Sequence, residues 1–461
     1  MKWIFGHQWI HSLVSSLCTY IICMIAPKNH LTKIGCFFVM AYMTLSHCYA
    51  MYTSYDSSYD RVDCTFNNSK VTDALPYCID HLDSASEPFA FTGTQMVLTM
   101  KLIAFIYNYH DGTTDKAKID SQWEAEKRDG KKTIFIVDYR KRYYITELPS
   151  LLDFLGYVYC FPAMLVGPAF EFQDYARAID GSIFGGKTPP SSFVPAMKCL
   201  GISIVALVLK ATISPYFPYA RIYSKEFMHL EFYVKCYTLY LTQIFERVKY
   251  YFIWKAAEGS CILAGFGYDP KENNWKGVEN IDILGFELAV NIQDLQKSWN
   301  KRTQSWLANY FFFRFPQKFS MNMFVTYFIS ALWHGLYPGY FISFMTVPIL
   351  DVIQKATRAK LNKYFELPSS GDAGGKPSVK YHPVWTLICF IGTLIGMNWA
   401  LLFFNLYSWK RCVQAFEAFY YYPHILFIAV AVFLTVLPAP RKNEGDNNNK
   451  KSGKSEAKKE K

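Results

Sequence analysis

The chain has 461 residues, of which 51% are hydrophobic, 18% are aromatic and only 18% are charged. This charged share is below the roughly 25% that is usual for soluble domains, so the composition predicts a membrane-embedded protein rather than a soluble one. The formal net charge of +11 comes partly from loops and partly from the last residues. Basic clusters beside membrane spans commonly set orientation or meet anionic lipid headgroups, so this charge does not indicate a nucleic-acid partner.

The apolar runs predict the membrane elements, because about 20 apolar residues are needed for a helix to cross a bilayer. In chain order the runs are residues 10–26, 34–51, 94–109, 151–169, 194–213, 233–257, 319–350, 384–406 and 424–437. The stretch 281–315 is amphipathic and rich in polar residues. From these segments, some of which are expected to be re-entrant, we predict an all-α polytopic membrane protein. It would have roughly 10–11 transmembrane or re-entrant helices around an intramembrane chamber.

Two loops suggest the topology. Residues 53–91 are acidic and poor in lysine and arginine, which favours the lumenal side, whereas 111–147 is dense in both charge signs, as cytoplasmic loops are. Asn67 begins a glycosylation sequon, and Cys64 and Cys78 flank it. A disulfide between these cysteines and two free thiols both remain open.

No internal repeat or seam divides the chain, so we expect one domain over residues 1–438. Residues 439–461 form a basic, low-complexity tail that is disordered by composition and expected in the cytosol. Lys458 and Lys459 resemble the dilysine retrieval signal of endoplasmic-reticulum membrane proteins, which contacts the COPI coat. A tail that is merely rich in lysine is the alternative.

His334 is the one titratable imidazole in the apolar stretch 321–344. An ionisable side chain at that depth is costly and is a functional-site hypothesis by default. Gly335, Pro338 and Gly339 are expected to break the helix just after it, which leaves backbone groups that only a protein-lined cavity can satisfy. The alternative is a core or interfacial histidine bonded to a backbone carbonyl.

Two further segments carry polar groups beside aromatic ones. At helical spacing, residues 292–306 place Asn300 and Thr303 on a polar stripe and Trp299 and Trp306 on an apolar one. An interfacial helix anchored by tryptophan is the alternative.

The second segment, residues 247–259, places Arg247 and Lys249 beside paired tyrosines, where they could hold a phosphate. Snorkelling side chains in an aromatic belt are the alternative. Lys101, in the middle of the run 94–109, either snorkels to an interface or pairs inside the bundle.

Several motifs, in their order along the chain, resemble the membrane-bound O-acyltransferase (MBOAT) family, specifically its lysophospholipid acyltransferase branch and most closely the broad-specificity fungal enzymes. The stretches that carry the resemblance are Phe91-Thr92-Gly93 through Asn108-Tyr109-His110-Asp111-Gly112, Phe161-Pro162-Ala163-Met164-Leu165-Val166-Gly167-Pro168, residues 247–259, Trp299-Asn300 with Thr303 and Trp306-Leu307, and Trp333-His334-Gly335 with Tyr337-Pro338-Gly339-Tyr340.

The resemblance implies transfer of a fatty acyl group from acyl-CoA to the free hydroxyl of a lysophospholipid, as in phospholipid remodelling and biosynthesis (the Lands cycle). With the dilysine-like Lys458 and Lys459, the expected location is the endoplasmic-reticulum membrane. Acyl-CoA would be a co-substrate, with no tightly bound cofactor and no metal. His334 and Asn300 match the family's catalytic pair. Candidates for substrate contacts are Arg247, Lys249, Tyr250, Tyr251, Trp254, Glu258, Trp299, Thr303, Trp333, Gly335, Pro338 and Gly339.

The chemistry of these residues agrees with that implication. A neutral imidazole can take the proton of a lipid hydroxyl as it attacks a thioester. The carboxamide of Asn300 can donate to the oxyanion that develops, or it can orient the acceptor. Two alternatives remain open: an acyltransferase that acts on another lipid or on a protein, and a polytopic transporter or proton relay.

Overall fold

The computed structural model describes residues 6–55, 91–128, 135–186, 188–315, 321–366 and 381–436. Over these residues the regular elements are helices, with two isolated bridges between Asp269 and Asn274 and between Glu366 and Tyr381. The prediction of an all-α fold is confirmed. The predicted sequon, the cysteine pair Cys64 and Cys78, the tail 439–461 and its dilysine lie outside the described residues.

The described residues form the following helices, with short 3-10 turns between some of them. In chain order they are α2 (Trp9–Ile25), α3 (Leu31–Tyr55), α5 (Thr92–Thr113), α6 (Lys116–Arg128), α7 (Phe135–Tyr143), α8 (Leu151–Val158), α9 (Phe161–Met164), α10 (Phe172–Ile179), α11 (Phe193–Thr212), α12 (Lys225–Met228), α13 (Phe232–Leu263), α14 (Ile283–Glu287), α15 (Ile292–Ser298), α16 (Lys301–Leu307), the π-helix η7 (Ala308–Phe312), α17 (Asn322–His334), α18 (Pro338–Leu361), α19 (Pro383–Leu406), α20 (Trp409–Ala418) and α21 (Tyr422–Val436).

Several helices are long and apolar enough to cross a membrane. Among the described residues four meet that criterion by themselves, and they are Gly6–Ile25, Leu31–Tyr52, Phe193–Tyr223 and Pro383–Leu406. The pair α20 and α21, bent by 70° at its break, makes up to five. The chain is therefore a multi-pass membrane protein, as its composition predicts.

Two of the predicted apolar runs are broken into shorter helices. Residues 151–169 form only α8 and α9, because Pro162 begins a new turn and Gly167-Pro168 ends it. Residues 319–350 divide where Gly335 adopts φ 134° and ψ −175°, a conformation that is essentially restricted to glycine. Pro338 then starts α18 at a position where its missing N–H costs nothing. The predicted break after His334 is confirmed.

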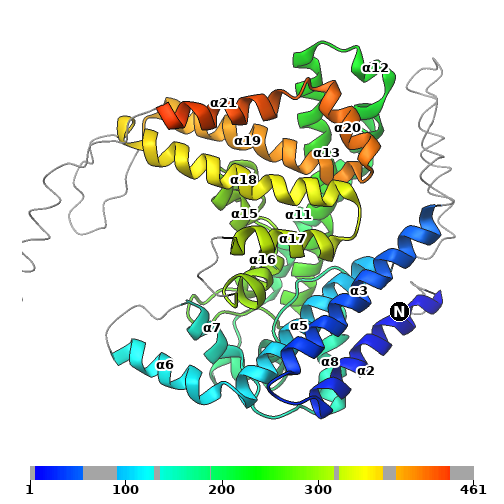
Figure 1. The fold of residues 1–461 in the computed structure, drawn as a ribbon. Helices are drawn as coiled ribbons and strands as arrows, with labels where there is room; N and C mark the ends of the chain where they lie inside the picture. Colours follow the sequence, from blue (N-terminus) through cyan, green and yellow to red (C-terminus); the bar gives the residue numbers. More distant parts are fainter. Residues whose placement is uncertain are drawn as a thin grey trace, which may run out of the picture.

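The short central helices lie between two groups of longer ones (Figure 1). The helices α2, α3 and α5 pack together on one side, and α18, α19 and α21 pack together on the other. The helix α17 contacts both α3 and α18, whereas α16 contacts α5 and α15 contacts α18. The segment from α15 to α17 thus connects the two groups.

The buried apolar side chains form three clusters. The first surrounds α5 and contains Trp306 and Trp333. The second lies where α13, α15, α18 and α19 meet, and Trp299 packs against it. The third is built around Trp399 and the end of α19. The boundary between the first two clusters falls within residues 299–306, beside Asn300.

Candidate active site

Asn300 sits at a break between two helices. It has φ 43° and ψ 53°, the left-handed conformation that asparagine tolerates better than most residues. The segment that precedes α14 holds this break, because Lys301 N donates to Asn280 O at 2.8 Å and Asp282 N donates to Ser298 O at 2.9 Å. The expectation of one continuous helix through residues 292–306 is therefore wrong.

The break turns the two predicted anchor tryptophans toward different cores. The Trp299 ring lies 5.0 Å from that of Trp254 and 4.7 Å from that of Phe286, in the second cluster. The Trp306 ring lies 5.9 Å from that of Trp333, in the first. Asn300 thereby lies, partly buried, at a junction rather than on one helix face.

Thr303 holds the carboxamide of Asn300. Its hydroxyl lies 2.8 Å from Asn300 Oδ1 and 3.6 Å from Met100 Sδ on α5. Among the described residues, no hydrogen bond uses Asn300 Nδ2. The amide is therefore fixed through its oxygen while its NH2 group can donate to a ligand.

His334 is the last residue of α17 and is surrounded by aromatic rings. Its imidazole stacks on Phe344 at 4.8 Å and meets Phe404 edge-on at 5.0 Å, with Tyr340 at 5.6 Å. The side chain is only partly buried, and no hydrogen bond from a described group reaches its ring. A ring nitrogen of His334 can therefore accept a bond from a ligand hydroxyl.

Both residues belong to helices that pack on the same part of α5. The Trp333 indole donates to Met96 O at 3.0 Å, and Thr303 contacts Met100. Met96 and Met100 are one helical turn apart, so they lie on one face of α5. No hydrogen bond joins Asn300 to His334 within the described residues, and the contact between Trp306 and Trp333 bridges their helices.

A second histidine, which the sequence reasoning missed, supports this site. His47 on α3 is 7% exposed, and its Nε2 lies 3.0 Å from the backbone oxygen of Trp333. A Cβ added to Gly335 would lie 3.4 Å from His47 Nδ1. His47 therefore touches the residues on both sides of His334. Its position inside the apolar run 34–51 is the signal that could have revealed it.

The predicted phosphate-binding cations already have carboxylate partners. Arg247 pairs with Glu287 at 2.8 and 2.9 Å and donates to Asn398 Oδ1 at 3.0 Å. Lys249 pairs with Glu246. The assignment of Arg247 and Lys249 to a phosphate group stays a prediction.

The other candidates on α13 lie in the same neighbourhood. Tyr251 donates to the Glu287 carboxylate, and the Tyr250 and Trp254 rings meet Trp299 edge-on at 5.5 and 5.0 Å. Glu258, further along α13, accepts two bonds from Lys255 at 2.9 and 3.0 Å.

The glycines and the proline after His334 shape the backbone. Gly339 N donates to Tyr407 O at 2.8 Å, and a Cβ at Gly339 would lie 2.3 Å from Phe403 O. Pro338 is exposed at the start of α18. Close packing of α18 on the end of α19 explains Gly339 without a substrate contact.

One group among the described residues has the spacing of metal ligands, namely His110, Asp111 and Asp115. Arg140 donates to Asp111 at 2.6 Å and to Asp115 at 2.6 Å, and Arg314 binds both oxygens of Asp111 at 2.7 and 2.8 Å. These guanidinium groups compensate the carboxylates, so the group is an ion-pair network at the end of α5.

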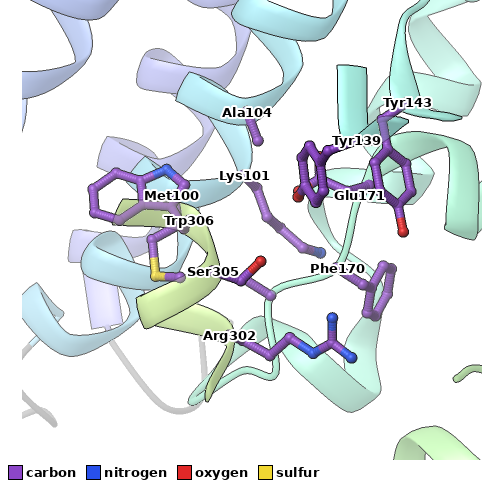
Figure 2. Close-up of a pocket in the computed structure, with 11 residues that line it drawn as sticks. Met100, Lys101, Ala104, Tyr139, Tyr143, Phe170, Glu171, Arg302, Ser305 and Trp306 are labelled. Carbon is purple, nitrogen blue, oxygen red and sulfur yellow. The ribbon is translucent and has the colours of Figure 1, made fainter. Parts of the chain in front are cut away.

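A small cavity lies between α5, α7 and α16, with residues 169–171 on its fourth side (Figure 2). It measures about 20 Å³, room for about one water-sized group. Lys101 and Arg302 reach it from α5 and α16, and Trp306 lines it as well. Trp306 also contacts the ring of Trp333, the residue before His334.

Comparison with known proteins identifies the fold family. Residues 87–371 match the model of MBOAT, the membrane-bound O-acyltransferase family. A lysophospholipid acyltransferase of Schizosaccharomyces pombe is 31% identical over 364 residues, which are 76% of this chain and 67% of the relative. Lysophospholipid acyltransferase 5 of Mus musculus is 25% identical over 95% of this chain and 82% of its own length. Lysophospholipid acyltransferase 1 of Arabidopsis thaliana is 27% identical over 77% and 75%.

Proposed function

The chain belongs to the membrane-bound O-acyltransferase family, and we propose that it transfers a fatty acyl group from acyl-CoA to the free hydroxyl of a lysophospholipid. The acceptor class follows the names of three relatives, from a fungus, a mammal and a plant. The observation that carries the proposal is the state of His334. Its imidazole stands at the end of the apolar helix α17, is partly buried among aromatic rings, and receives no hydrogen bond from the described residues.

In the proposed reaction, His334 is the general base. Its neutral imidazole takes the proton of the lipid hydroxyl as that oxygen attacks the thioester carbonyl carbon. The carbon–sulfur bond then breaks, and the imidazolium returns the proton to the departing CoA thiolate. Because CoA is a good leaving group, no covalent acyl-enzyme is needed, which agrees with buried, unactivated cysteines such as Cys261.

Asn300 acts beside the base in this scheme. Its Nδ2 group is available, because Thr303 engages only Oδ1. A donor of this kind stabilises the oxyanion of the tetrahedral intermediate, or it orients the acceptor hydroxyl toward the base. Both roles require the carboxamide to keep the orientation that Thr303 gives it.

The test compares His334→Ala with His229→Ala, which removes an exposed histidine after α12. Both variants are purified in detergent and given labelled oleoyl-CoA with separate acceptors: lysophospholipids, diacylglycerol, a sterol and a peptide. Loss of a general base lowers the rate by about 10²–10⁴-fold, so His334→Ala should lose transfer to lysophospholipids while His229→Ala keeps it. Full transfer by His334→Ala at normal abundance would refute the assignment, and preference for another acceptor would refute the substrate class.

We also propose that the protein resides in the endoplasmic reticulum and that Lys458 and Lys459 contact the COPI coat. The support is the position of the two lysines, third and fourth from the end of the printed sequence. Replacing both with serine should move a fluorescently tagged protein to later compartments. An unchanged distribution would leave the tail without this role.

A further inference from the structure

Among the described residues, some buried cations have a carboxylate partner, whereas Lys101 and Lys235 bond to backbone oxygens and the partly buried Arg302 has no ion pair. Arg247 has Glu287, and Lys255 has Glu258 at 2.9 Å. Among the described residues, no carboxylate oxygen lies within ion-pairing distance of Lys101 or Arg302. Both of these side chains line the cavity between α5, α7 and α16 (Figure 2).

Lys101 is 1% exposed and bonds only to the backbone. Its ammonium donates to Tyr157 O at 2.6 Å and to Val158 O at 3.4 Å, and it lies 4.7 Å and 4.9 Å from the centres of the Tyr157 and Phe170 rings. Carbonyl oxygens and ring faces attract a cation, but they do not neutralise it. A buried charge without a counter-ion is costly, and an anion in the adjoining cavity would reduce that cost.

Arg302 lies two residues after Asn300 on α16. Its Nε is buried without a hydrogen-bond partner, and its guanidinium extends across the cavity toward Phe170 (Figure 2). It interacts electrostatically with Asp174, but Arg142 and Arg177 share that carboxylate at 3.8 and 3.6 Å. Asp174 therefore interacts with three guanidinium groups.

The only carboxylate that lines this cavity is already occupied. Glu171 accepts bonds from Asn108 at 2.7 Å, Tyr139 at 2.6 Å and Tyr310 at 2.7 Å. Burial raises the pKa of the Glu171 carboxyl above its usual value, which the tyrosine hydrogen bonds oppose. The oxygens of Glu171 thus bond to neutral donors rather than to Lys101 or Arg302. The cavity therefore has two cationic side chains for one carboxyl group.

From this arrangement we propose that the cavity is a phosphate subsite, in which Lys101 and Arg302 hold a phosphate oxygen of a substrate. Its volume suits one such oxygen, and a guanidinium binds phosphate through directed hydrogen bonds. Trp306 lines the cavity and contacts Trp333, whose ring contacts that of His334. The inference rests on the proposed function, because the two substrates named there, acyl-CoA and the lysophospholipid, are the two sources of phosphate.

The test uses Arg302→Gln and a matched control, Lys301→Gln. Lys301 is the preceding residue and pairs with Glu279, so the control removes the same charge without reaching the cavity. We expect Arg302→Gln to raise the KM for one substrate about ten- to hundredfold, the usual effect of a lost hydrogen bond to a charged group. A rise for oleoyl-CoA identifies the CoA phosphates, and a rise for lysophosphatidylcholine identifies the headgroup. Arg302→Lys should restore part of the loss.

Unchanged KM values for both substrates, or an equal rise in Lys301→Gln, would overturn the subsite. A second readout avoids turnover: CoA or lysophosphatidylcholine is titrated against the thermal unfolding of wild type and Arg302→Gln. The concentration for half-maximal stabilisation should rise in the variant for the same compound, and equal curves for both compounds count against the subsite. If the wild-type protein binds these compounds but transfers no acyl group, the proposed function is refuted. The comparison of wild type with Arg302→Gln in the titration then decides whether the subsite exists.

Discussion

His47 offers a sharp prediction, because it acts on His334 only through the backbone. Nε2 must carry the proton in its bond to Trp333 O, since a carbonyl can only accept. The last carbonyls of a helix have no partner within the helix, and Trp333 O belongs to that set at the end of α17. We therefore expect His47 to position the peptide that carries His334 rather than to take part in the chemistry.

The size of the effect follows from the bond that is lost. His47→Leu introduces an apolar side chain of similar bulk and removes the donor. The Trp333 carbonyl is then buried without a partner, at a cost of about 1–3 kcal/mol. Each 1.4 kcal/mol corresponds to about tenfold in rate. If the whole cost falls on the reactive orientation of His334, the rate should fall about 5- to 150-fold. The loss should appear in kcat, because the base acts in the transition state.

The assay measures kcat and KM for oleoyl-CoA and lysophosphatidylcholine with His47→Leu and His47→Gln. Glutamine keeps an N–H at a similar reach, so His47→Gln should recover most of kcat. A role in folding alone would lower the amount of active enzyme in both variants, which active-site titration and the unfolding midpoint detect. Wild-type kcat in His47→Leu, or equal losses in the two variants, would refute the reasoning.

The remaining predictions concern packing and orientation near the site. Thr303→Val removes the hydroxyl bound to Asn300 Oδ1, so kcat should fall about two- to twelvefold, the equivalent of 0.5–1.5 kcal/mol, and Thr303→Ser should restore it; equal rates for valine and serine would contradict this role. Gly339→Ala places a Cβ 2.3 Å from Phe403 O and should lower the unfolding midpoint by the equivalent of about 1–3 kcal/mol. Gly392→Ala on α19 is the control, since a Cβ there meets nothing within 4 Å, and an equal loss in both variants would contradict the steric argument.

The features that could be predicted from sequence depend on local chemistry. Long apolar runs predicted α2, α3, α11 and α19, because the length needed to cross a bilayer can be read directly from hydropathy. The end of α17 was predictable from another local feature, because Gly335 permits a backbone conformation that other residues avoid.

The features that could not be predicted depend on contacts far along the chain. Asn300 permits a helix end but does not require one, and the break forms there because the backbone bonds to Asn280 and Asp282 replace helical ones. The partner of a cation is equally hidden: Glu287 lies 40 residues from Arg247, and only the packing of α14 on α13 brings them together. Sequence alone therefore identified the cations but not which of them keep an uncompensated charge.

The two proposed reacting groups share a structural setting that explains why both breaks matter. A side chain inside a regular helix lies on a face that packs against neighbours, and its backbone polar groups are satisfied. Asn300 and His334 each stand at a helix end, where neither condition holds. The backbone groups that lack a helical partner there bond to distant residues instead. Lys301 N, next to Asn300, donates to Asn280 O, and Trp333 O, next to His334, accepts from His47. Because these partners hold the backbone, the Asn300 carboxamide and the His334 imidazole can each keep a polar atom that makes no hydrogen bond within the described residues.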